Sequence, residues 1–180
     1  MERSGLKAQS ILLQDGITEE ELRKEILKQF GSLEKALRHV LQNDSDKAHK
    51  ALKMLLKLGV SATEKLVGPL VISKKIFFDD ASPLEIACRT RNIEAVRILC
   101  EHGADPREVR IEGISLLHFT IWFHDHKVDV RTQGKVTAKV ASILLDHGAD
   151  PNERSTKYGT PLQSAISMWM CYWVTPNMYV

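Results

Sequence analysis

The stretch that decides the fold runs from Ser82 to Pro106 and reads SPLEIACRTRNIEAVRILCEHGADP. It opens with a helix start, in which Ser82 is suited to cap backbone N–H groups and Pro83 fits the first helical position. Glu85 stands where a capping box needs a carboxylate. The stretch closes with a helix stop, because Gly103 suits a left-handed residue and the proline that follows cannot continue a helix. Two short amphipathic segments lie between, so the stretch predicts a pair of helices joined by a turn.

The same order of residues recurs further along the chain. A second copy starts at Ser115-Leu116-Leu117-His118 and stops at His147-Gly148-Ala149-Asp150-Pro151, and a third starts at Thr160-Pro161-Leu162. The first two starts are 33 residues apart and the next two are 45 apart (82, 115 and 160). A period of about 33 residues is typical of a repeat built from a turn and two helices. The excess places an insertion at residues 126–137, which we expect to be a polar surface loop.

These caps, core positions and stops resemble the ankyrin repeat, whose pattern runs Thr-Pro-Leu-His, two small residues, Val-Val, Leu-Leu and Gly-Ala-Asp. The resemblance extends over residues 80 to 167. It implies an all-α fold, a short ankyrin-repeat solenoid behind an N-terminal helical segment. It also implies a protein that binds other proteins and carries no catalytic activity.

The organisation of the whole chain follows from these matches. Residues 1–60 are expected to form the N-terminal helical segment, 61–80 an extended loop, and 81–180 the repeats, about two full copies and a truncated third. Within the first segment, Thr18 to Glu21 reads as a capping box. A helix ending at Gly59 has the apolar spacing of the second helices of the repeats, so we interpret it as a degenerate repeat or a cap of the solenoid.

Composition narrows the setting and the class of partner. The formal net charge of +2 over 180 residues gives no global field for nucleic acid or anionic membrane. Three cysteines form no disulfide framework, which favours a reducing intracellular location, cytoplasmic or nuclear. Met1 to Leu6 has no apolar secretory core, and no run of apolar residues is long enough to span a membrane.

The last 23 residues, from Tyr158, contain no charged side chain, and the second helix expected of a third repeat does not follow. Two interpretations remain open. The chain has a truncated or alternative C-terminus, or residues 168–180 form a tail that binds a partner or a second copy.

Candidate catalytic and metal-binding groups favour structural roles. His118, His124 and His126 invite a metal, but i and i+2 side chains on a helix point apart, and His118 occupies a position that the ankyrin pattern uses for loop hydrogen bonds. Cys88 and Cys100 fall on predicted core faces, and no phosphate-binding loop or nucleophile elbow is present. We therefore expect no enzyme activity, no cofactor and no metal.

The resemblance places partner contacts on the loop tips and on the outward side of each first helix. The residues at those places are Arg107, Arg110, Phe119, Trp122, Arg154, Lys157 and Tyr158. Arginine and aromatic side chains dominate binding energy when they are desolvated. The expected function is a protein–protein interaction adaptor whose partner is another protein.

Two alternatives remain open beside the adaptor. One is a substrate-recognition subunit of a ubiquitin ligase complex. The other is a regulator associated with nucleic acid, which would use a basic stripe on the helix ending at Gly59. The four residues of that stripe are Lys47, Lys50, Lys53 and Lys57.

Overall fold

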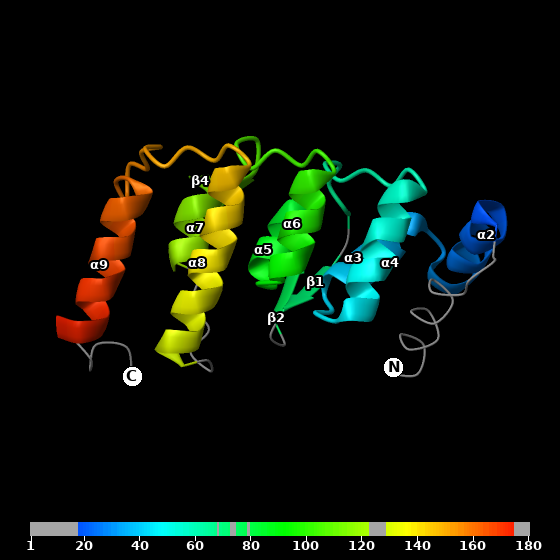
Figure 1. The fold of residues 1–180 in the computed structure, drawn as a ribbon, viewed down its shortest axis with the longest axis horizontal. Coiled ribbons are helices and arrows are strands. Elements are labelled where there is room, and N and C mark those ends of the chain that lie inside the picture. The colour runs from blue at the N-terminus through cyan, green and yellow to red at the C-terminus, as the bar shows by residue number, and fades with distance from the viewer. Residues whose placement is uncertain (1–17, 68, 73–74, 79, 123–128, 175–180) are drawn as a thin grey trace. The chain divides into compact units, whose positions relative to one another are not determined.

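The computed structural model describes residues 18–67, 69–72, 75–78, 80–122 and 129–174, and it is dominated by helices (Figure 1). The helices confirm the all-α class. The chain divides into two compact units, Met1–Ala104 and Asp105–Val180, and each is described here by itself. The helices of the first unit are α2 (Glu19–Phe30), α3 (Leu33–Leu41), α4 (Asp46–Lys57), α5 (Pro83–Arg89) and α6 (Ile93–Glu101).

Side-chain caps set the starts of the helices in the first unit. Thr18 and Glu21 form the expected capping box at α2, and Gly31 ends that helix at a φ of 75°. The hydroxyls of Ser32, Ser45 and Ser82 each accept a backbone N–H at the next three starts in this series. The capping box expected at Ser82 is only half formed, because the carboxylate of Glu85 bonds Arg89 instead of reaching back.

The core of the first unit lies between two helix pairs. α3 packs on α4 and α5 on α6, while α3 also contacts α5 and α4 contacts α6. Large side chains from all four helices are fully buried there: Leu37, Leu41, Leu52, Leu55, Leu84, Ile86, Ile98 and Leu99. The pair α3–α4 therefore stacks on α5–α6 as one repeat stacks on the next. That α4 belongs to a degenerate repeat remains a prediction.

Residues 61–80, expected to be an extended loop, contain paired strands instead. β1 (Pro69–Ile72) and β2 (Lys75–Phe78) form an antiparallel hairpin in which Pro69 lies opposite Phe78 and Ile72 opposite Lys75. The bases of the segment are joined by a bond from the backbone N–H of Leu66 to the carbonyl of Ala81 (2.8 Å). Branched and aromatic residues favour strands, and pairing satisfies backbone groups that a loop would leave to water.

The second unit contains three helices and a short hairpin among its described residues. They are β3 (Arg110–Ile111), β4 (Ile114–Ser115), α7 (Leu116–Trp122), α8 (Val130–Asp146) and α9 (Pro161–Val174). α7 is the central element, since it contacts α8, α9 and both strands. The buried side of this unit includes Ile111, Leu116, Val140 and Leu144.

The loop expected at residues 126–137 is wrong from Val130 onward. α8 has 17 residues where α6 has 9, so eight further residues are helical at its N-terminal end. Asp129 accounts for this start, because its carboxylate accepts the backbone N–H groups of Arg131 and Thr132 (3.0 and 3.1 Å). Polar composition alone does not decide against a helix when a cap is present. Residues 126–128 lie outside the described ranges.

The third start forms as expected, but its apolar residues do not become core. Thr160 and Gln163 make a complete capping box, with both reciprocal bonds in place (2.9 and 3.3 Å). Leu162 is nevertheless 68 % exposed and Ile166 50 % exposed, whereas Leu84 and Leu117 at the equivalent of Leu162 are at most 3 % exposed. In the described part of the chain no second helix follows α9, so these side chains lack the covering that α6 and α8 provide elsewhere.

Candidate functional site

The predicted partner-binding residues all belong to the second unit, and His118 organises the backbone around them. The imidazole is 1 % exposed. Its Nε2 lies 2.9 Å from the carbonyl oxygen of Gly159, so Nε2 carries the proton and donates it. Its Nδ1 lies 2.7 Å from the hydroxyl oxygen of Ser115, so these two side chains share a hydrogen bond. His118 thus ties the start of α7 to the loop before α9, the structural role that the sequence indicates.

The loop that His118 holds requires a glycine at its end. Gly159 has a φ of +68°, where side chains other than glycine are strained. A Cβ there would also meet the amide of Gln163, which completes the cap of α9. Ser155 pairs with Gly159 through two backbone bonds of 2.8 and 3.0 Å, which fixes the intervening turn. Residues 156–158 are thereby presented on a closed loop.

Arg107 is largely committed to its own loop. Its guanidinium makes a two-point contact with Asp105, with a shortest Nη2–Oδ2 distance of 2.6 Å. The Arg107 side chain and backbone N–H lower the pKa of Asp105, and the same contact raises the pKa of Arg107. The side chain is still 66 % exposed. Arg107 can therefore approach a partner as one member of an ion pair rather than as a free charge.

Arg110 connects two of the loops that the resemblance implicates. Its Nη2 lies 2.8 Å from Oε1 of Glu153, with both side chains partly exposed. The contact links β3 to the loop that precedes α9. It orders the loops, and an exposed pair of this kind contributes about 0–1 kcal/mol to stability.

Among the predicted contact residues, an aromatic pair and one cation lie in contact. The rings of Trp122, at the end of α7, and Tyr158 have centroids 4.6 Å apart and are tilted by 42°. The ammonium of Lys157 lies 5.1 Å from the centroid of the Tyr158 ring, within the range of a cation–π contact. Both aromatic residues are half-buried, while Arg154 and Lys157 are exposed. We call these four residues the aromatic patch.

Phe119 is the one predicted contact residue that the structure removes from the surface. It is only 8 % exposed, so its ring belongs to the core of the second unit. Five consecutive residues of α7, Leu116 to Thr120, are buried, so this helix is covered on every side. The burial of Phe119 supports a packing role.

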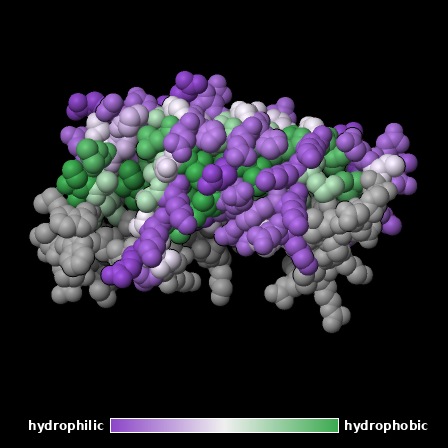
Figure 2. Space-filling model, viewed as in Figure 1, coloured by the Kyte–Doolittle hydropathy of each residue, from purple (hydrophilic) through white to green (hydrophobic). Residues whose placement is uncertain are grey.

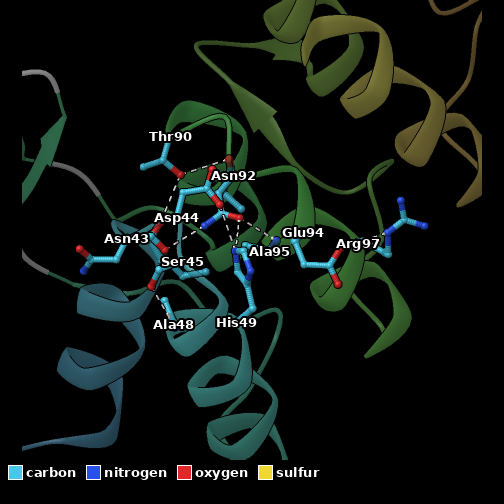
Figure 3. A network of polar contacts seen from close by, with 12 residues as sticks. Asn43, Asp44, Ser45, Ala48, His49, Thr90, Asn92, Glu94, Ala95 and Arg97 are labelled. Carbon is cyan, nitrogen blue, oxygen red and sulfur yellow. Dashed lines mark hydrogen bonds and ion pairs between the residues drawn. The ribbon is translucent and has the colours of Figure 1, made fainter. Parts of the chain in front are cut away.

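A polar network in the first unit was not anticipated from the sequence (Figure 3). The side-chain oxygen of Asn92 accepts the backbone N–H of Ala95 and the Nε2–H of His49, both at 2.9 Å. Its amide nitrogen donates to the carbonyl of Asn43 (3.1 Å), and Nε2 of His49 also lies 3.2 Å from Asp44. The network joins the α3–α4 turn to the α5–α6 turn, and Asn92 at its centre is only 1 % exposed. The sequence could indicate Asn92 as a helix cap, because it directly precedes α6. It could not indicate the bonds to His49 and Asn43, which are distant in the sequence.

The candidate nucleophiles, Cys88 and Cys100, lie in the core. Both are buried thiols, and burial raises the pKa of the Cys88 thiol far above its usual range. Within the described ranges, no group of three His, Cys, Asp or Glu side chains could hold a metal ion. His124 and His126 lie outside those ranges. None of the helices searched in the described residues is long and apolar enough to cross a membrane.

Comparison with protein families identifies part of the chain. The ankyrin repeat family model matches residues 79–108, which include α5, α6 and the loop that begins at Asp105. No curated protein matches the chain. Ankyrin repeats are protein–protein interaction modules. The matched stretch contains the capped helix pair of residues 82–106. Residues 79–108 therefore form an ankyrin repeat.

Proposed function

We propose that this protein is a non-catalytic adaptor that binds another protein through the aromatic patch of its second unit. The observation that carries the proposal is the half-buried Trp122–Tyr158 pair with the Lys157 ammonium over the Tyr158 ring, and with an exposed arginine, Arg154, four residues before Tyr158. Tryptophan, tyrosine and arginine are the residue types that contribute most binding energy at protein interfaces. The loop that presents Tyr158 is fixed by His118 and Gly159, so little ordering cost falls on binding.

The absence of catalysis is part of the proposal and rests on how the reactive side chains are used. The His118 ring has both nitrogens committed to loop contacts, and the Cys88 thiol is buried with a raised pKa. Both conditions oppose general-base or nucleophilic chemistry. We also propose an intracellular setting, cytoplasmic or nuclear, because two buried thiols suit a reducing compartment.

Affinity capture with the full chain as bait tests the proposal. The double variant Arg154→Ala/Lys157→Ala changes two exposed side chains, and we expect it to lose at least one protein that the unaltered chain retains. The pair Trp122→Ala/Arg154→Ala should lose the same protein more completely, with helicity followed by circular dichroism. Lys135→Ala/Lys139→Ala on α8 is the control, because it removes two exposed lysines from the same unit.

The outcome that contradicts the proposal is equally specific. If every captured protein is retained by both patch variants at the level of the control, the aromatic patch is not the binding surface. Loss in the tryptophan variant alone, accompanied by reduced helicity, would point to the packing role of Trp122.

A further inference from the structure

The outer face of α4 carries four lysines of one sign. Lys47, Lys50, Lys53 and Lys57 are all exposed, and their spacing of three, three and four residues places them on one side of the helix. The opposite side is the buried one, formed by Ala48, Ala51, Leu52 and Leu55. Figure 2 shows hydrophilic side chains over the face of α4 turned toward the viewer. We call the four residues the lysine stripe.

The equivalent positions of α6 show that this charge is not required by the fold. Aligning Gly59 with Gly103 places the lysine stripe opposite Arg91, Glu94, Arg97 and Glu101. Two of each sign stand there, and Arg97 lies 3.4 Å from Glu94. Arg91 precedes α6, so the aligned positions have a formal charge of zero over Arg91 and α6 together, against +4 on α4. Within the described residues, no side chain of the lysine stripe takes part in a hydrogen bond or ion pair.

Neighbouring groups offset little of this charge. Like charges at i, i+3 and i, i+4 on a helix repel one another, so the lysine stripe opposes the folding of α4. Arg23 of α2 donates to the carbonyl of Leu58 (2.9 Å), which brings a further cation to the C-terminal end of α4. At the other end, Asp44 is engaged by His49 at 3.2 Å. On α4 itself the acidic residue is Asp46, in the first turn, so the rest of the stripe has no acidic neighbour on its own helix.

We propose that the lysine stripe binds an acidic segment of a partner protein, rich in Asp and Glu. This deepens the adaptor function, on which it rests, by assigning a second surface and the chemistry of what it takes. The stripe runs over about 15 Å and is one helix wide, which matches a single acidic helix or extended peptide. Ammonium groups on flexible stems suit carboxylates that are spaced along such a segment.

The observations favour an acidic protein segment over nucleic acid. The α4 sequence, DKAHKALKMLLK, has no arginine to bind phosphate with two parallel bonds and no Phe, Tyr or Trp on which a base could stack. Its one aromatic ring, that of His49, is engaged by Asn92 and Asp44. The whole chain has a net charge of only +2, whereas nucleic-acid-binding domains present a strongly basic field. Binding of DNA through the stripe is therefore an outcome of the test rather than the proposal.

The test titrates the full chain with a fluorescein-labelled oligoglutamate peptide of 12 residues, the length of α4. The stripe variant replaces Lys47, Lys50, Lys53 and Lys57 by Gln. The control variant replaces four exposed lysines outside the stripe by Gln and changes the net charge by the same amount. They are Lys24, Lys28, Lys35 and Lys65. We expect the stripe variant to lose about tenfold or more in affinity, the control about threefold or less, and binding to weaken with salt.

Each other result overturns the proposal. Equal losses of affinity in the two variants would mean that peptide binding responds to net charge alone. An unchanged affinity in the stripe variant would mean that the lysine stripe contacts only solvent. Tighter binding of a random DNA oligonucleotide that depends on the same four lysines would assign the stripe to nucleic acid. Because the peptide titration uses no cellular partner and leaves the aromatic patch intact, its failure leaves the capture experiment on that patch to stand or fall separately.

Discussion

The starts of α5 and α9 have nearly the same sequence but different surroundings. Ser82-Pro83-Leu84 and Thr160-Pro161-Leu162 each begin a helix with a side-chain cap and a proline in the first turn. Leu84 is fully buried, while Leu162 is 68 % exposed. The difference teaches that the start signal is local, whereas burial of the leucine depends on a second helix that packs on the first. α6 supplies that helix for α5.

The largest effect that separates the two starts is expected from removing the leucine. Leu84→Ala should lower the free energy of unfolding by about 2–5 kcal/mol, because it deletes core methyl groups and leaves a cavity. Leu162→Ala should change it by about 0.5 kcal/mol or less, since the side chain is already in water. Urea denaturation followed by circular dichroism measures both. Similar losses at the two positions would mean that Leu162 is covered in solution.

A smaller effect is expected from the third residue after each cap. Glu85 holds the buried Arg89 at 2.9 Å, and both side chains are about nine-tenths buried. Glu85→Ala should therefore cost about 1–3 kcal/mol, the penalty of removing the partner of a buried polar group. Gln163→Ala breaks one exposed bond to Thr160 and should cost about 0.5–1 kcal/mol. A greater loss at Gln163 than at Glu85 in the same denaturation assay would reverse this ranking.

The smallest contrast should come from the caps themselves. Ser82→Ala and Thr160→Ala each remove a hydroxyl that accepts a backbone N–H, at 3.2 and 3.3 Å. Each should cost about 1 kcal/mol, and the two costs should be similar because capping is local. Glycine at either position restores most of the loss and serves as the control. Costs that differ by more than about 1 kcal/mol would show that the surroundings control the caps as well.

Sequence reasoning succeeded where the cause of a structure lies within a few residues. The cap at Thr18, the glycine stops and the helix pair of residues 82–106 all belong to this class. It failed for the strands at 69–72 and 75–78. Their composition suits strands, but the repeat pattern has no place for strands there, so the sequence predicts a loop. It also failed for residues 130–137, where the cap supplied by Asp129 outweighed polar composition.

The candidate site shows the same division. Trp122, Arg154, Lys157 and Tyr158 could be selected from their place in the repeat pattern and their residue types. Their mutual geometry could not, because the Trp122–Tyr158 contact joins residues 36 positions apart (122 and 158). The Asn92 network escaped for the same reason, since its bond to Asn43 spans 49 residues. The burial of Phe119 depended on a packing direction that the heptapeptide of α7 alone does not specify.

The additional eight residues of α8 have a practical consequence for biophysical work. A chain segment added to a loop would carry an attached label on a flexible tether, whereas eight helical residues add a rod of about 12 Å. Thr132 is exposed in this extension, and its backbone N–H is fixed by Asp129. A spin label introduced there by Thr132→Cys would therefore turn with α8 itself, and its spectrum would report the tumbling of the second unit rather than local motion of the probe.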